Sequence, residues 1–217
     1  MKGVKYTYDS KYKFNEEWFD HNIPLWTQLF DGYGRDIESV LEVGCYEGRA
    51  TVFLCNEILK PGTNYDIVDT FGGSEVEDGM DTTMERLKED KDIIEKTFLH
   101  NISFHKDINF HINKGISQIV LPDLLSAKKK YDLIFIDASH RADDTFVDAY
   151  FAHKMLNRGG ILIFDDFGWK DPNQPHAVSS PELGIRTFIA MYEKEYTVTH
   201  VGYQVVLCKN LHKTFSV

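Results

Sequence analysis

The stretch YDLIFIDASHRADDTFVDAYFAHKMLNRGGILIFDDFGW, residues 131–169, decides the fold of this chain. It contains two apolar runs, and each run ends abruptly in acid, the first at Asp137 and the second at Asp165 and Asp166. Between the runs, apolar side chains recur at helical spacing over residues 142–156. Such a pattern predicts two buried parallel strands connected by a helix.

The three acids fall at the carboxyl ends of neighbouring strands. Ligands of open α/β sheets bind outside this edge, so we expect Asp137, Asp165 and Asp166 to face a site rather than the core. The alternative is that Asp137 caps the next helix and the other two acids form a solvated strand exit. Successive strand residues point to opposite faces, so Asp165 and Asp166 share a site only where the strand has turned into a loop. Gly168 allows such a turn.

Length, charge and cysteine content narrow the class of protein. The chain has 217 residues, and we expect one domain, with residues 1–36 as an N-terminal helical cap on a core of residues 37–217. Acidic residues outnumber basic ones by 34 to 24, which argues against nucleic acid as a partner. No apolar run is long enough to span a membrane, and three dispersed cysteines without a CxxC motif indicate a cytoplasmic protein.

A second informative stretch, SVLEVGCYEGRATVFLCN at residues 39–56, predicts a strand, a glycine-containing turn and a helix. Such a turn lets backbone N–H groups approach a ligand closely, with the helix N-terminus behind them. The dinucleotide motif GxGxxG is absent because Tyr46 stands in place of its second glycine, which disfavours NAD. The next strand ends at Asp69, about 25 residues beyond Gly44, where a carboxylate suits the hydroxyls of a ribose.

The rest of the chain continues the alternation of strands and helices. Predicted strands cover residues 40–43, 64–68, 108–112, 133–136, 161–164, 196–199 and 204–207. A helix is predicted from Asn15, with either a kink at Pro24 or a division there into two short helices. Further predicted helices cover a segment from Arg49, 80–98, a segment ending at 125, 142–156 and 183–192, with a turn at 157–160. We therefore expect a doubly wound α/β fold, whose seven-stranded sheet is mostly parallel, ends in an antiparallel C-terminal hairpin and carries helices on both faces.

Several motifs in the right order resemble those of a known family. Residues 41–48 resemble the first motif of the catechol and caffeoyl-coenzyme A O-methyltransferases, including the tyrosine in place of a glycine. Residues 115–118 are similar to their adenine-binding segment. Asp137 and Asp165 match their metal-binding acids, and Asp166 takes the place of an adjacent Asn or Asp. The chain is thereby identified as resembling class I S-adenosylmethionine-dependent methyltransferases, which implies their Rossmann-like fold.

A closer resemblance is to the branch that contains macrocin-type sugar O-methyltransferases. It is carried by the Asp-x-x-His from Asp137 to His140, the aromatic Phe167 after the acid pair, and the segment WFDHNIPLW at residues 18–26. Membership of that branch implies S-adenosylmethionine as methyl donor, Mg²⁺ or another divalent cation as a cofactor, and a hydroxyl of a small molecule as acceptor. A sugar or sugar nucleotide is the acceptor class that the resemblance suggests.

The resemblance also assigns roles to individual residues. The expected cofactor-binding residues are Glu42, Gly44, Tyr46, Gly48, Asp69, Ser117, Gln118 and Asp137. The expected metal ligands are Asp137, Asp165 and Asp166, and the expected catalytic residues are His140 and Asp137. An imidazole with an ordinary pKa near 6.5 suits the removal of a hydroxyl proton. The alternative is that His140 is a surface histidine on its loop.

Two other functions stay open on the sequence. One is a metal-independent methyltransferase that acts on an amine or a carboxylate, with the three acids in structural roles. The other is a non-catalytic nucleotide-binding domain of the same fold. Segments 72–105 and 169–181 are expected to influence acceptor specificity, and the aromatic N-terminal segment could serve a homodimer.

Overall fold

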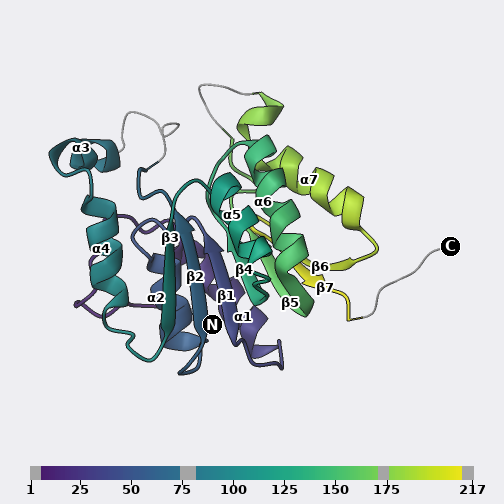
Figure 1. Ribbon diagram of the computed structural model, residues 1–217, viewed down its shortest axis with the longest axis horizontal. Helices are drawn as coiled ribbons and strands as arrows, with labels where there is room; N and C mark the ends of the chain where they lie inside the picture. Colours follow the sequence, from purple (N-terminus) through teal and green to yellow (C-terminus); the bar gives the residue numbers. More distant parts are fainter. Residues whose placement is uncertain (1–5, 74–81, 171–175, 212–217) are drawn as a thin grey trace.

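The computed structural model describes residues 6–73, 82–170 and 176–211, and in this part of the chain seven strands form one sheet in the order β3-β2-β1-β4-β5-β7-β6 (Figure 1). The strands are β1 (Ser39–Val43), β2 (Asn64–Asp69), β3 (Asn109–Lys114), β4 (Tyr131–Ile136), β5 (Leu156–Phe164), β6 (Tyr196–Val201) and β7 (Val205–Lys209). Strands β1 to β5 pair in parallel, whereas β7 pairs antiparallel with both β5 and β6. The predicted fold class is confirmed.

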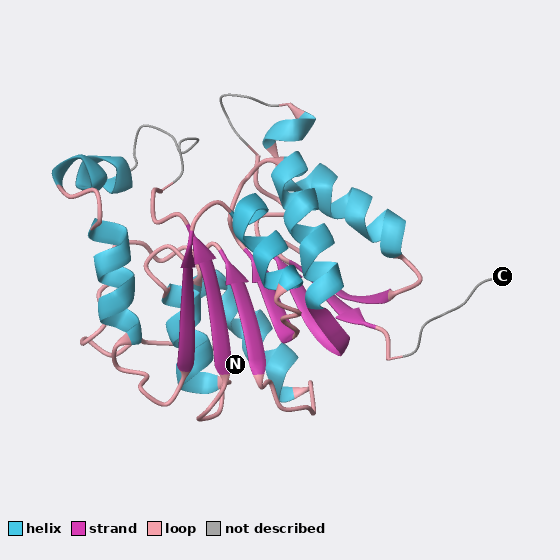
Figure 2. Ribbon diagram, in the orientation of Figure 1, coloured by secondary structure: helices cyan, strands magenta, loops and turns pink. Residues whose placement is uncertain are grey.

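Helices cover both faces of the sheet, as Figure 2 shows. The helices are α1 (Ile23–Asp31), α2 (Arg49–Glu57), α3 (Thr82–Glu89), α4 (Ile93–Ile102), α5 (Ser117–Ser126), α6 (Ala142–Met155) and α7 (Pro181–Tyr192), with short 3-10 helices η1 (Asp20–Asn22) and η2 (Ala177–Ser179). Helices α1, α2 and α4 pack on one face, and α5, α6 and α7 pack on the other. The sheet is therefore the middle layer of three.

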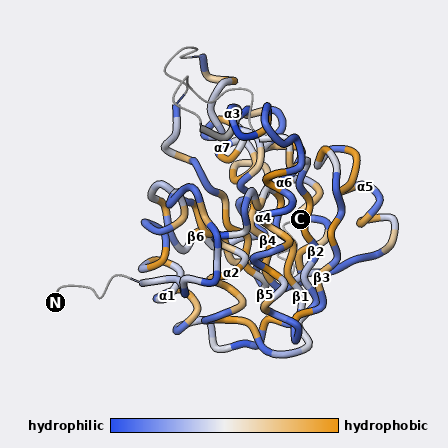
Figure 3. The backbone as a smooth tube through the Cα atoms, turned by 90° about the vertical axis from the view of Figure 1, so that its left-hand side faces the viewer, coloured by the Kyte–Doolittle hydropathy of each residue, from blue (hydrophilic) through white to orange (hydrophobic). Residues whose placement is uncertain are grey.

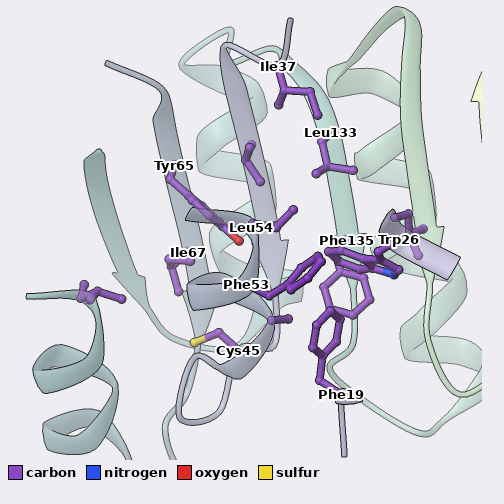
Figure 4. Packing of buried hydrophobic residues seen from close by; sticks show 14 of the residues in the cluster. Phe19, Trp26, Ile37, Cys45, Phe53, Leu54, Tyr65, Ile67, Leu133 and Phe135 are labelled. Carbon is purple, nitrogen blue, oxygen red and sulfur yellow. The ribbon is translucent and has the colours of Figure 1, made fainter. Parts of the chain in front are cut away.

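The central strands are apolar on both faces because each face meets a helical layer. In β4, Phe135 faces the α1 side and Ile134 faces the α6 side, and both are fully buried. On the α1 side, Trp26 packs edge-on against Phe135 and Phe19, with ring centroids 4.9 Å apart in each pair (Figure 4). Figure 3 shows hydrophobic residues gathered along the strands and hydrophilic ones along the outer loops, as this layering requires.

The helix predicted from Asn15 is wrong in its first half. Asn15 does not cap a helix; its backbone and side-chain N–H groups instead donate to the Glu47 carboxylate at 2.7 Å each. The α-helix begins only at Ile23, and Pro24 lies in its first turn rather than at a kink. Proline is favoured there because its fixed φ suits a helix start and its missing N–H would have no intrahelical partner.

Two other boundaries differ from the sequence predictions. The single helix expected over 80–98 is two helices, α3 and α4, separated where the Asp90 carboxylate accepts a hydrogen bond from the backbone N–H of Asp92. Such a local side-chain bond competes with helix continuation. The turn expected at 157–160 is instead the start of β5, which has Gly159 at φ +77° and a register shift against β4.

The carboxyl ends of the parallel strands bring the two informative stretches together. The backbone N–H of Gly44 donates to Val68, that of Asp137 to Val43, and that of Asp165 to Ile136, at 2.8–2.9 Å. These bonds continue the sheet by one residue beyond the strand ends. The glycine turn and the acids consequently lie at one edge, toward which the arrowheads of β1, β2 and β3 point in Figure 2.

Candidate functional site

A cavity of about 560 Å³ opens at this edge of the sheet. Most of the predicted site residues line it: Gly44, Tyr46, Asp69, Ser117, Gln118, Asp137, His140, Asp165 and Asp166. Glu42 and Gly48 are the two that lie outside its lining. The structure therefore brings the residues expected for cofactor, metal and catalysis to one place.

The turn after β1 is built around the carboxylate of Asp69. Its Oδ2 accepts hydrogen bonds from the backbone N–H groups of Cys45 and Tyr46 at 2.6 and 2.9 Å, and its Oδ1 accepts one from Phe71 at 2.6 Å. Tyr46 has φ +50°, an uncommon value for a residue with a side chain. Asp69 thus holds the turn in shape while it also lines the cavity.

Gly44 and Gly48 are needed for close packing. A Cβ on Gly44, whose φ is +82°, would lie 1.9 Å from the carbonyl oxygen of Asp137. A Cβ on Gly48, whose φ is +79°, would lie 2.8 Å from the ring of Phe98 on α4. Gly44 therefore lets the turn approach the end of β4, and Gly48 lets α4 pack behind the turn.

Glu42 is buried and supports the turn from behind. Its Oε2 accepts hydrogen bonds from the hydroxyls of Thr51 on α2 and Tyr65 on β2, at 2.7 and 2.5 Å. Burial raises the pKa of Glu42 to about 7, and the two hydroxyls oppose that rise. These contacts are those of a residue that supports the turn, and cofactor binding by Glu42 stays a prediction.

The acids on the other side of the cavity have different partners. Asp165 accepts a hydrogen bond from Gln204 Nε2 at 2.8 Å and one from Asn22 Nδ2 at 3.3 Å. Asp166 has φ +56°, so the chain has left the strand at this residue, and its Oδ2 lies 2.8 Å from Nε2 of His140. This turn is what allows consecutive acids to face the same cavity.

Burial and mutual repulsion control the ionisation of these acids. Burial raises the pKa of Asp137 well above its usual range, and the charges of Asp165 and Asp166 raise it further. Burial raises the pKa of Asp165 to about 7, again with a contribution from Asp166. Burial opposes the ionisation of Asp166 too, but the hydrogen bond and charge of His140, together with a hydrogen bond from Tyr203, outweigh burial and hold the pKa of Asp166 below its usual value.

The metal ligands expected from the sequence are not assembled into a coordination site. In residues 6–73, 82–170 and 176–211, no three His, Cys, Asp or Glu side chains form a group able to hold a metal ion. Asp165 is turned toward Gln204, and Asp166 is turned toward His140. The donor chemistry nevertheless suits a hard divalent cation, because carboxylate oxygens are the ligands that Mg²⁺ prefers.

Aromatic rings surround the part of the cavity near the acids. Trp169 stacks on His140 with ring centroids 4.3 Å apart, and His21 packs edge-on against Tyr203 at 5.2 Å. On the cofactor side, half-exposed Trp18 lies 5.1 Å from the ring of Tyr46. These rings give this part of the cavity flat apolar surfaces beside charged groups.

Sequence reasoning missed several of these neighbours. The partners of Asp165 come from the N-terminal segment and the C-terminal hairpin, at sequence distances of 143 residues for Asn22 and 39 for Gln204. Glu47 was also missed: it is buried in the glycine turn and binds Arg86 of α3 at 2.7 Å as well as Asn15. The sequence signal for Glu47 was its position as an acid between Gly44 and Gly48, and this position alone does not identify its partners.

This sheet order, with its antiparallel hairpin, glycine turn and ligand-edge cavity, defines a class I methyltransferase fold. A family model described as a methyltransferase domain matches residues 41–167, more than half of the chain. The chain belongs to this family and is an S-adenosylmethionine-dependent methyltransferase, as the sequence predicted.

Solved structures with similar folds are distant in sequence. An O-methyltransferase from Bacillus cereus in complex with SAH is 18% identical with a TM-score of 0.57, over 88% of this chain and 80% of that one. CalS11, a TDP-rhamnose 3′-O-methyltransferase of calicheamicin biosynthesis, is 17% identical with a TM-score of 0.51, over 87% and 77%. MycE, a methyltransferase in complex with Mg, SAH and mycinamycin VI, is 14% identical with a TM-score of 0.53, over 92% and 50%.

No curated protein sequence matches the chain. Within the described ranges, no helix combines the length and the apolar character needed to cross a membrane.

Proposed function

We propose that this protein transfers the methyl group of S-adenosylmethionine to a hydroxyl of a small molecule, with a sugar as the acceptor class. The observation that supports the proposal best is the pair of His140 and Asp166, 2.8 Å apart, in the same cavity as the glycine turn. A base beside a methyl-donor site is what a hydroxyl acceptor needs, because a protonated hydroxyl is a poor nucleophile.

The cofactor side of the cavity is assigned to residues around the turn. S-adenosylmethionine supplies an electrophilic methyl group on a sulfonium. Gly44 and Tyr46 would lie along its methionine portion, Asp69 would accept hydrogen bonds from the ribose hydroxyls, and Ser117 and Gln118 would contact the adenine. Gly48 and Glu42 act indirectly, by keeping the turn in place. Positioning of this kind supplies much of the rate of an in-line displacement.

Proton removal is assigned to His140. The acceptor oxygen attacks the methyl carbon while the carbon–sulfur bond breaks, and the hydroxyl proton passes to Nδ1 of the imidazole, because Nε2 faces Asp166. Nδ1 is buried in the structure, so the acceptor reaches it only when the side chains around it shift. The Asp166 carboxylate stabilises the imidazolium that results, and the stacked ring of Trp169 fixes its plane. The neutral thioether S-adenosylhomocysteine and the methyl ether are then released.

We include a divalent cation, Mg²⁺ in the first instance, in this proposal. Asp137, Asp165 and Asp166 would hold it, and a bound cation would orient the acceptor hydroxyl and lower its pKa. The support is the donor set and the similar fold of MycE, whose structure contains Mg. Binding would require Asp165 and Asp166 to exchange some of their present partners for the ion.

A metal-independent O-methyltransferase is the second candidate. It is favoured by the direct contact of His140 with Asp166 and by the absence of a preassembled metal group from the described residues. In that case Asp165, held by Gln204 and Asn22, is structural. The two candidates differ in one measurable property, the effect of chelation.

The proposal of a sugar acceptor rests on two kinds of support. The rings of Trp18, His21, Trp169 and Tyr203 line the cavity, and flat aromatic surfaces suit the apolar faces of sugar rings. In addition, one protein of similar fold is described as acting on TDP-rhamnose.

The test is transfer of labelled methyl groups to a panel of free sugars, glycosides and nucleotide sugars, with Mg²⁺ or with EDTA. We expect a methyl ether as product, loss of activity in EDTA, and at least a hundredfold loss of kcat in His140→Ala. Asp143→Asn, an exposed change beyond the cavity lining, is the matched control and should leave the rate unchanged. Full activity in EDTA would favour the second candidate, and methylation of an amine would contradict both.

A further inference from the structure

Asp148 of α6 is a fully buried acid that the proposed mechanism does not use. It faces the first turn of α5, where Gln118 Nε2 donates to its Oδ1 at 3.5 Å and the hydroxyl of Ser117 forms a further hydrogen bond. Its other oxygen, Oδ2, has no hydrogen-bond partner in the described part of the chain. Burial of a carboxylate lowers the stability of a fold unless the group is well paired. A buried acid that is bonded to Ser117 and Gln118, and has one oxygen without a partner among the described residues, therefore suggests a role beyond stability.

Both partners of Asp148 belong to the cavity. Ser117 and Gln118 line it and are the first two residues of α5. The residue before them, Ile116, provides no side-chain cap for the helix. Asp148 therefore places an acid from a neighbouring helix close to the positive end of α5, which favours the ionised carboxylate. Burial opposes this and raises the pKa of Asp148 to about 7, although the hydrogen bond from Ser117 lowers it.

We propose that Asp148 is a positioning residue that orients the Gln118 amide for recognition of the adenine amino group. The NH₂ group of Gln118 faces Asp148 in the structure, and above pH 7 the ionised carboxylate, which only accepts hydrogen bonds, holds it in that orientation. The carbonyl oxygen of Gln118 is then the group left for the cavity. A carbonyl oxygen accepts a hydrogen bond from the exocyclic amino group of adenine and rejects a base that carries an oxygen there.

This inference rests on the proposed cofactor site and extends it to base selectivity. It predicts that the protein distinguishes S-adenosylhomocysteine from S-inosylhomocysteine, in which a carbonyl replaces the amino group. A buried polar contact left unpaired is strongly disfavoured, so we expect wild-type protein to prefer the adenine compound by tenfold or more.

The experiment is calorimetric titration of wild-type protein and Asp148→Asn with both compounds. An asparagine at 148 is nearly isosteric, but it can either donate to or accept from Gln118, so it no longer fixes the amide. We expect the preference for adenine to fall below about threefold in Asp148→Asn. Asp143→Asn removes the same charge from the exposed face of the same helix and should keep the wild-type preference.

A double-mutant cycle separates this role from general destabilisation. If Asp148 acts through Gln118, the double variant Asp148→Asn with Gln118→Leu should discriminate no less than Gln118→Leu alone. Retention of the full preference in Asp148→Asn, or equal weakening toward both compounds, would overturn the inference and leave the cofactor site intact. Failure of wild-type protein to bind either compound would overturn the cofactor site, and the inference with it.

Discussion

Replacement of Gly44 by alanine is the sharpest test of how the site is assembled. The residue has φ +82°, and the new Cβ would lie 1.9 Å from the carbonyl oxygen of Asp137 and 2.7 Å from Cα of Ala138. Both obstacles are backbone atoms, which cannot rotate away as a side chain can. The end of β1 must then separate from the end of β4 by more than about 1 Å to reach an ordinary contact distance.

The magnitude has two parts. A side chain in the left-handed region costs about 1–2 kcal/mol of folding free energy. The backbone clash adds to this, and we expect a total loss of at least about 4 kcal/mol, which is exceptional for a single substitution. Gly62→Ala supplies the control, because Gly62 has φ +90° and nothing lies within 4 Å of its added Cβ. It carries the conformational cost without the clash.

The assay is urea unfolding followed by tryptophan fluorescence, with the free energy of unfolding extrapolated to water. Gly44→Ala should be less stable than Gly62→Ala by at least about 2 kcal/mol. It should also bind S-adenosylhomocysteine more weakly where it remains folded, because the turn N–H groups move with the strand end. Equal stability of the two variants, within about 0.5 kcal/mol, would refute the argument that close approach requires Gly44.

Two other predictions concern buried polar groups. Burial lowers the pKa of His153 to about 4, so the free energy of unfolding should fall by up to about 3 kcal/mol as the pH falls from 6.5 to 4. This loss should be absent in His153→Phe. If wild type and His153→Phe show the same pH dependence in urea unfolding, the prediction is contradicted. Trp26→Phe should lower the free energy of unfolding by about 1–3 kcal/mol beyond the lost ring contacts, because the indole N–H donates to Gln204 Oε1 at 2.7 Å. The same change made in a Gln204→Leu background, where Asp165 has already lost this donor, should lack the extra cost, and an equal cost in both backgrounds would contradict that origin.

The sequence predicted features that depend on neighbours along the chain. The apolar runs that end at Asp137 and Asp165 correctly predicted β4 and β5, because an apolar run and the polar residue that ends it are adjacent in the sequence. The glycine turn was equally local: the predicted turn connects β1 to α2, and in the structure Gly44 and Gly48 both have positive φ. The division into a cap and a core at residue 36 stays a prediction.

What the sequence could not predict depends on contacts between distant segments. Trp26 meets Gln204 across 178 residues, and Asn22 meets Asp165 across 143. Asn15 looked like a helix cap, yet a tertiary contact with Glu47 takes its side chain instead. Polar side chains have several compatible partners nearby in sequence, and only the fold determines which one is used.

Two glutamines show how the fold specifies a polar site. An amide side chain has a donor end and an acceptor end, and a neighbour that offers only one function fixes which end faces the site. The indole of Trp26 only donates, so Gln204 accepts from it and presents its NH₂ group to Asp165. Gln118 donates from its NH₂ group to the carboxylate of Asp148, and the proposal made above leaves its carbonyl for the cavity. In the proposed cofactor site, the acid side would thereby gain a donor and the adenine side an acceptor, although both are made from the same residue type.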